Sequence, residues 1–174
     1  MRAFDVEELS THGGSLRVYA CREEARNHPS SPRIAKVIDD ENRAGLSTAA
    51  GYESFAAQVK QTKLALVEFL VDAAKAAKRV AGYGAPGKSA TLLNYCGIDK
   101  DLIEYTVDRS PYKQGRFLPG SRIPIYHPDR IRETRPDFVV VLPWNLKDEI
   151  MQQLQFIRQW GGRFVIPIPR LIVD

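Results

Sequence analysis

Short apolar segments alternate with segments of helical spacing between residues 79 and 167, and this alternation restricts the fold more than any other feature. The spacing predicts helices over 87–95 and 147–160, and strands over 79–83, 104–108, 137–143 and 163–167. The run Phe-Val-Val-Val-Leu at 138–142 is typical of a strand buried on both faces. Strands and helices in turn, joined by right-handed crossovers, predict an α/β fold with a Rossmann-like, doubly wound, mostly parallel sheet and helices on both faces.

The first part of the chain has a different pattern. Alternating apolar residues around Gly13 and Gly14 predict a short β-hairpin with strands over 3–8 and 15–22. Because a lone hairpin is marginally stable in water, we expect it to dock on the rest of the chain, on a second subunit or on sequence outside these residues.

A polar segment with two prolines, 27–32, predicts a linker after the hairpin. We therefore divide the chain into a hairpin region, 1–26, and a Rossmann-like domain, 33–174. Helical spacing over 33–45 and 52–78 predicts two helices before the sheet. The longer helix has an apolar stripe, which is typical of a packed crossover helix or an interface helix.

The composition excludes several classes of protein. With 174 residues, 44% of them hydrophobic and 26% charged, the chain is globular and not disordered overall. Its net charge of +4 is spread along the sequence without a basic run, so we expect no nucleic-acid partner. Two cysteines, Cys21 and Cys96, cannot supply a four-cysteine zinc site. No stretch is apolar enough for a membrane span or a signal peptide, so we expect no membrane association and a cytoplasmic location.

The segment 82–89, Gly-Tyr-Gly-Ala-Pro-Gly-Lys-Ser, lies between a predicted strand and a predicted helix and fits two phosphate-binding patterns. A P-loop is disfavoured because Pro143, not a carboxylate, follows the later strand, and because Pro86 fixes its own φ inside the loop. The dinucleotide pattern at Gly82, Gly84 and Gly87 is better supported, since Asp108 follows about twenty residues later, where a ribose partner is expected. A tight turn without any ligand is the third interpretation.

A long irregular stretch, 108–125, follows a predicted strand and contains basic and aromatic residues together. In open α/β sheets, ligands bind at the carboxyl ends of the strands. Guanidinium and ammonium groups beside aromatic rings suit a phosphate with an attached base or sugar, although a solvated basic loop would have the same composition. The residues concerned are Arg109, Lys113, Arg116, Arg122, Tyr112 and Phe117.

Six segments together resemble one family over nearly the whole chain. They are Phe-Asp-Val-Glu-Glu-Leu at 4–9, Thr-His-Gly-Gly-Ser-Leu-Arg-Val-Tyr at 11–19, Gly-Tyr-Gly-Ala-Pro-Gly-Lys at 82–88, Leu-Leu-Asn-Tyr at 92–95, Val-Asp-Arg-Ser-Pro-Tyr-Lys-Gln-Gly at 107–115 and Leu-Pro-Trp-Asn at 142–145. This combination is similar to the C-terminal portion of S-adenosylmethionine-dependent C-methyltransferases that act on nucleotide-linked deoxysugars.

The resemblance implies a three-part enzyme: a zinc-binding cysteine module, a central methyltransferase domain with the S-adenosylmethionine site and the catalytic residues, and a Rossmann-like C-terminal domain. Residues 1–22 match the last hairpin of the central domain, and the remainder matches the C-terminal domain. Nothing in this sequence matches the zinc cysteines, the S-adenosylmethionine loop or the catalytic segment, so we expect them upstream of residue 1. We expect no catalytic residue, no cofactor bound by this chain itself and no methyl transfer by this chain alone.

For this part of the family, the resemblance implies binding of a dTDP-type nucleotide sugar. His12 would face the methyl-transfer cleft if its hairpin sits as in the family. The local sequence by itself indicates only a turn residue at this position. The possible partners are a methyltransferase-domain chain or a second copy of this chain. A stand-alone NAD(P)-binding or nucleotide-binding module and a non-catalytic dimerisation domain remain alternatives. The expected substrate-binding residues are Gly82, Gly84, Gly87, Lys88, Asp108, Arg109, Lys113, Arg116 and His12.

Overall fold

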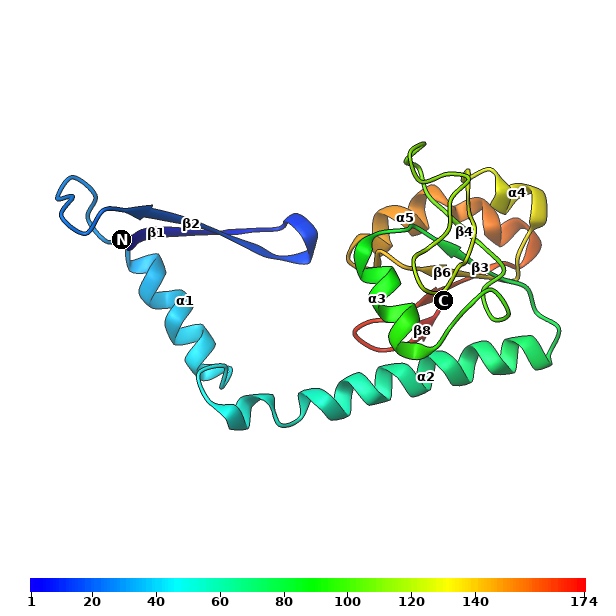
Figure 1. The fold of residues 1–174 in the computed structure, drawn as a ribbon, viewed down its shortest axis with the longest axis horizontal. Helices are drawn as coiled ribbons and strands as arrows, with labels where there is room; N and C mark the ends of the chain where they lie inside the picture. The colour runs from blue at the N-terminus through cyan, green and yellow to red at the C-terminus, as the bar shows by residue number, and fades with distance from the viewer. The chain divides into compact units, whose positions relative to one another are not determined.

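The computed structural model describes all 174 residues, and the chain divides into two compact units, Met1–Gln58 and Val59–Asp174 (Figure 1). The boundary lies within a long helix, α2 (Phe55–Lys75), and therefore later in the chain than the polar segment at 27–32. The helix after that segment, α1 (Pro32–Arg43), belongs to the first unit. No helix combines the length and the apolar character that crossing a membrane would require.

The first unit consists of an antiparallel hairpin, β1 (Arg2–Leu9) and β2 (Ser15–Cys21), with α1 packed against β1. Ser31 caps α1: its Oγ accepts a hydrogen bond from the Arg33 amide, and Pro32 occupies the first turn, where its missing N–H costs nothing. The Ser31 amide in turn donates to the Phe4 carbonyl, 2.7 Å away, and Arg33 pairs with Asp5. These contacts join the helix to the hairpin.

A six-stranded sheet forms the centre of the second unit. Its strands are β3 (Val80–Tyr83), β4 (Thr106–Val107), β5 (Ile125–Tyr126), β6 (Phe138–Val141), β7 (Arg163–Ile166) and β8 (Ile172–Val173). The order across the sheet is β5-β4-β3-β6-β7-β8, and every pair is parallel except β7 with β8. Numbered along the chain from β3, this is the Rossmann order 3-2-1-4-5-6. The predicted α/β class and its Rossmann-like sheet are confirmed.

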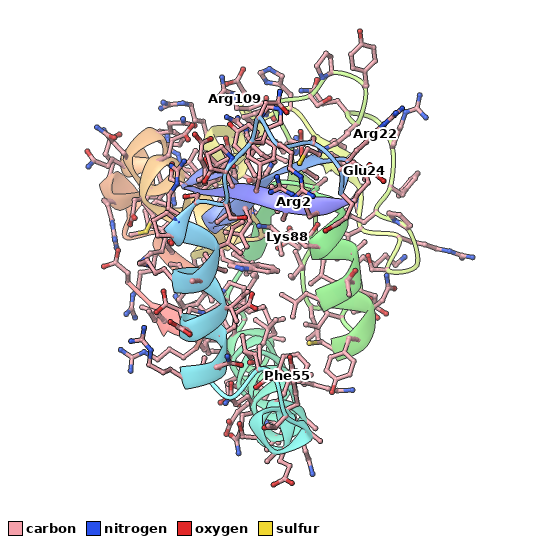
Figure 2. All side chains as sticks on the ribbon, turned by 90° about the vertical axis from the view of Figure 1, so that its left-hand side faces the viewer. Arg2, Arg22, Glu24, Phe55, Lys88 and Arg109 are labelled. Atoms are coloured by element: carbon pink, nitrogen blue, oxygen red, sulfur yellow. The ribbon has the colours of Figure 1, made fainter.

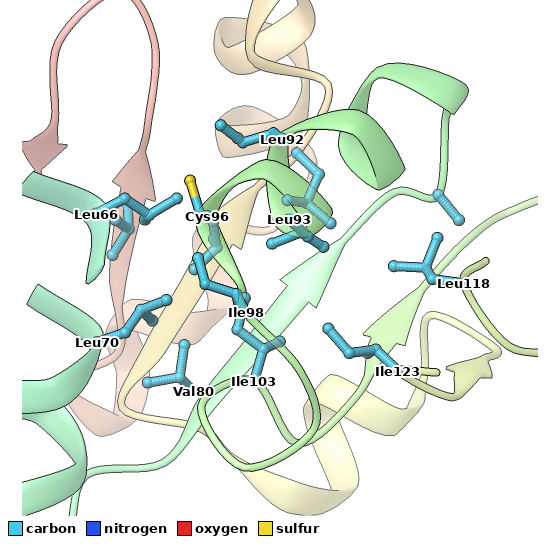
Figure 3. Close-up of a cluster of buried hydrophobic side chains, with 14 of the residues drawn as sticks. Leu66, Leu70, Val80, Leu92, Leu93, Cys96, Ile98, Ile103, Leu118 and Ile123 are labelled. Atoms are coloured by element: carbon cyan, nitrogen blue, oxygen red, sulfur yellow. The ribbon is translucent and has the colours of Figure 1, made fainter. Parts of the chain in front are cut away.

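Alternate residues of the central strands bury their side chains on opposite faces of this sheet. On one face, Val80, Val140 and Val165 contact α2 and the next helix, α3 (Gly87–Cys96), in the cluster shown in Figure 3. On the other face, a second cluster contains α4 (Arg130–Thr134), α5 (Lys147–Gln153) and the 3₁₀ helix η4 (Gln155–Trp160). Helices therefore cover both faces, as a doubly wound sheet requires.

Several elements differ from the sequence prediction. β5, α4 and β8 were not expected, and the helix predicted over 147–160 is divided into α5 and η4. The strand predicted over 104–108 pairs as a strand only at Thr106 and Val107. Two further 3₁₀ helices, η2 (Ala49–Tyr52) and η3 (Trp144–Leu146), precede α2 and α5, and a third, η1 (Thr11–Gly13), forms the hairpin turn.

Candidate ligand-binding site

The carboxyl ends of β3 and β6 adjoin at the point where the strand order reverses. From β3 the chain continues through α3 to β4 on one side, and from β6 it continues through α5 to β7 on the other. Such a reversal leaves a crevice between the two outgoing loops. A pocket of about 240 Å³ lies here, which we call the switch-point pocket. It is lined by Tyr83, Gly84, Pro86, Asp108, Arg109, Lys113, Pro143, Leu146, Glu149, Ile150 and Gln153.

Three glycines lie between the end of β3 and the start of α3, and the fold restricts them differently: Gly82 is in β3, Gly84 is in the loop and Gly87 begins α3. At Gly84, φ is +89° and a Cβ would lie 2.7 Å from Cγ and Cδ of Pro143, so a side chain is excluded both by conformation and by space. At Gly82, a Cβ would lie 2.9 Å from the Thr106 Oγ1, which donates a hydrogen bond to the Gly84 carbonyl. At Gly87 the corresponding space is open. The first two glycines are therefore needed by the fold itself.

Asp108 connects the loop after β3 with the loop after β4. Its Oδ2 accepts hydrogen bonds from the Ala85 amide at 2.7 Å and from the Lys113 Nζ at 3.1 Å, and its Oδ1 accepts one from the Ser110 amide at 2.8 Å. Burial alone would raise the pKa of this carboxyl, but the three donors outweigh burial and hold its pKa below the usual range. Both carboxylate oxygens therefore already accept hydrogen bonds from the two loops that border the pocket.

Lys88, labelled in Figure 2, lies in the first turn of α3, and its side chain contacts the loop after β6. Its Nζ donates to the Asn145 Oδ1 and lies 4.6 Å from the centre of the Trp144 ring. Burial lowers the pKa of this ammonium group. Since Asn145 uses only one of its three N–H donors, the ammonium group keeps donors for an anion.

The remaining predicted residues occupy different surroundings. The Arg109 side chain is 71% exposed, and its guanidinium lies 4.0 Å from the Glu149 carboxylate, on the rim of the pocket. Lys113 also lines this pocket, whereas Arg116 is exposed and lines none of the described pockets. His12 belongs to the first unit, where it is exposed in the turn between β1 and β2 with φ of +57°.

The sequence analysis predicted no binding role for several residues that border this site, although three of them lie in the segments that carry the resemblance: Tyr83, Trp144, Asn145, Glu149 and Gln153. A role for Asn145 could have been predicted, because this residue follows a second parallel strand. The carboxyl ends of adjacent parallel strands lie at the same edge of the sheet. Glu149 and Gln153 lie one helical turn apart on α5 and had no such signal, because their placement depends on how α5 packs.

Comparison with known proteins agrees with the sequence resemblance. Residues 10–169 match the model of the C-methyltransferase C-terminal domain. The chain belongs to this family. It is 36% identical over 169 residues to C-methyltransferase NovU of Streptomyces niveus; the match covers 97% of this chain and 40% of that relative. This family member therefore spans well under half of the length of NovU. The resemblance drawn from the six sequence segments is confirmed at this level.

Among solved structures, UDP-D-quinovosamine 4-dehydrogenase from Vibrio fischeri is similar with a TM-score of 0.38 and 20% sequence identity. That match covers 53% of this chain and 79% of the dehydrogenase chain.

Proposed function

We propose that the second unit is the substrate-binding part of an S-adenosylmethionine-dependent C-methyltransferase that acts on a nucleotide-linked deoxysugar of the dTDP type. The switch-point pocket is the observation that carries the proposal. It surrounds the Gly84 backbone with Lys113 and Arg109, and Lys88 lies beside it on α3. Such donors, with a helix that begins at the same edge, suit the phosphates of a nucleotide sugar.

The same charges do not suit the methyl donor. S-adenosylmethionine carries a sulfonium cation, but both carboxylates of the pocket already face protein donors: the half-buried Asp108 accepts three hydrogen bonds, and Glu149 lies 4.0 Å from the Arg109 guanidinium. We therefore place the donor site outside these 174 residues. The occupied carboxylate also disfavours the NAD(P) alternative, which relies on a free acid for the ribose hydroxyls.

Calorimetric titration of the purified chain with dTDP, a dTDP-deoxysugar, a UDP-sugar, S-adenosylmethionine, NAD and ATP tests this function. We expect binding of the dTDP compounds and a higher melting temperature in their presence, because a ligand that binds only the native state stabilises it. Arg109→Gln should weaken this binding about tenfold, a typical loss for a charge-assisted hydrogen bond.

Lys100→Gln is the matched control, since it removes an exposed positive charge from the segment before β4, at the opposite edge of the sheet. It should leave the dTDP affinity unchanged. Binding of NAD or ATP without any binding of dTDP compounds would instead favour the nucleotide-module alternative. Binding of S-adenosylmethionine would contradict the placement of the donor site.

A further inference from the structure

A second pocket, of about 350 Å³, adjoins the switch-point pocket at the carboxyl edge of the sheet. We call it the outer pocket. Tyr83, Arg109 and Gln153 line both pockets, so the two cavities share one wall. The other residues of the outer pocket come from the loop after β5, from α4 and from the segment around η4. They are His127, Pro128, Asp129, Arg132, Leu154 and Phe156.

Tyr83 supplies an unused polar group on the shared wall. Its residue surface is only 6% exposed, and its ring belongs to the buried cluster beneath α4 and α5. The backbone of Tyr83 is bonded within the sheet, whereas its phenolic hydroxyl makes no hydrogen bond to the chain and is not an enclosed polar atom, so it reaches the surface of the pockets. A hydroxyl left free on the wall of two pockets is available to a ligand.

Tyr105 shows the ordinary arrangement on the same face of the sheet. It is 4% exposed, and its hydroxyl is hydrogen-bonded to the Thr134 Oγ1 at 2.5 Å. The two tyrosines thus share burial and the same hydrophobic cluster and differ in whether the hydroxyl has a partner. Burial raises the pKa of Tyr83, so its hydroxyl stays protonated near neutral pH and can donate.

Two arginines line the outer pocket together with Tyr83, while Asp108 and Glu149 also act on the Tyr83 hydroxyl from the side of the switch-point pocket. The Arg132 guanidinium lies 3.4 Å from the centre of the Phe156 ring and pairs with no carboxylate, so its N–H donors are free. The only carboxylate that lines the outer pocket is Asp129, which lies 3.1 Å from the His127 Nδ1. Arg109 lies on the shared wall, with Glu149 at 4.0 Å as its nearest acid. Two guanidinium groups and one free hydroxyl form a donor set typical of phosphate binding.

We propose that the outer pocket is a second phosphate subsite, in which the Tyr83 hydroxyl and the Arg109 and Arg132 guanidinium groups bind a phosphate of the ligand that also enters the switch-point pocket. The inference rests on the proposed function, because a diphosphate-linked ligand has adjacent phosphates that can contact both sides of the shared wall. It assigns Tyr83 and Arg132 as residues that determine affinity for the diphosphate.

Tyr83→Phe and Arg132→Gln test the subsite, each with a matched control. Tyr105→Phe removes the bonded hydroxyl of the same cluster, and Arg130→Gln removes a guanidinium of α4 that pairs with Glu133 and does not line the pocket. The probes are dTDP, thymidine and inorganic pyrophosphate, titrated calorimetrically into the 174-residue chain at low and high salt.

We expect Tyr83→Phe to weaken dTDP binding about tenfold, with thymidine binding and the melting temperature of the free protein unchanged. Arg132→Gln should weaken dTDP binding similarly and make it less sensitive to salt, because one screened ionic contact is lost. Tyr105→Phe should lower the melting temperature and leave dTDP affinity unchanged, and Arg130→Gln should leave dTDP affinity unchanged.

The outcomes separate the subsite from the proposed function. Wild-type affinity for dTDP in both Tyr83→Phe and Arg132→Gln overturns the subsite and leaves the proposed function intact. Equal weakening by Tyr83→Phe and Tyr105→Phe also overturns it, since the effect then belongs to the fold. If the wild-type chain binds pyrophosphate through Tyr83 and Arg132 but binds neither dTDP nor its sugars, the subsite stands and the proposed function fails. If it binds none of these probes, both fail.

Discussion

At the scale of single residues, Asp108 illustrates how a side chain can serve a site without touching the ligand. Asp108→Asn removes the charge and replaces one carboxylate oxygen by an NH₂ group that cannot accept, so either the bonds from Ala85 and Lys113 or the bond from Ser110 are lost. We expect a loss of about 2 kcal/mol of unfolding free energy at pH 7, the usual size for bonds to a buried charged group.

The lowered pKa of Asp108 fixes how this loss depends on pH. A carboxyl whose pKa is lower in the folded state stabilises the protein above its unfolded pKa, about 3.9, and loses that contribution as pH falls through the folded value. Urea unfolding should therefore show a gap between wild type and Asp108→Asn that is full at pH 7 and narrows below pH 4. Asp101→Asn, at an exposed acid, should show no gap. A gap that is constant with pH would contradict the role of the charge.

The glycine loop gives a second prediction at the residue scale. Gly84→Ala forces a Cβ against Pro143 at a positive φ, and we expect it to cost about 2 kcal/mol of stability or more. Gly87→Ala is the control at the first residue of α3, where a Cβ meets open space and alanine favours the helix. Thermal unfolding should show a lowered midpoint for the first variant and an unchanged or slightly higher one for the second. Equal effects would show that space and φ do not distinguish these glycines.

At the scale of elements, a helix or strand could be predicted from the sequence when its sequence pattern was long enough to recognise. β3, β6, β7 and α3 each extend over four or more residues and were predicted from their patterns. β4 pairs only at Thr106 and Val107, but it was predicted because its apolar pattern extends over 104–108. β5 and β8 have two residues each and α4 has five, so no periodicity can reveal them. β5 exists because β4 supplies backbone partners: the Thr106 amide donates to the Pro124 carbonyl and the Asp108 amide to the Tyr126 carbonyl. The outer pocket depends on the loop after β5 and on α4, so its residues could not be predicted.

The start of α1 gives a prediction at the element scale. Ser31 both caps α1 and bonds β1 through its amide, but only the cap depends on its side chain. Ser31→Ala should therefore destabilise the first unit by about 1 kcal/mol while leaving the link to Phe4 intact. Hydrogen exchange of the α1 amides should become faster in this variant, with the amides of β3 and β6 unchanged. Ser47→Ala, at an exposed serine after α1, is the matched control, and equal acceleration there would exclude a capping effect.

At the scale of the whole molecule, apolar burial is divided very unevenly between the two units. Val6 is the only buried hydrophobic residue of Met1–Gln58, whereas the second unit contains two buried clusters, one on each face of its sheet. Because burial of apolar surface is the main source of folding free energy, we expect the first unit to unfold at a lower urea concentration than the second.

Both tryptophans, Trp144 and Trp160, lie in the second unit, so their fluorescence reports its unfolding alone. Far-ultraviolet circular dichroism of the full chain should show an earlier transition, the unfolding of the first unit, that the tryptophan fluorescence does not detect. A fragment of residues 53–174, which retains all of α2, should unfold at the same fluorescence midpoint as the full chain and lack the earlier transition. A lower midpoint for the fragment would mean that the first unit stabilises the second, and the two would then have to be treated as one cooperative structure.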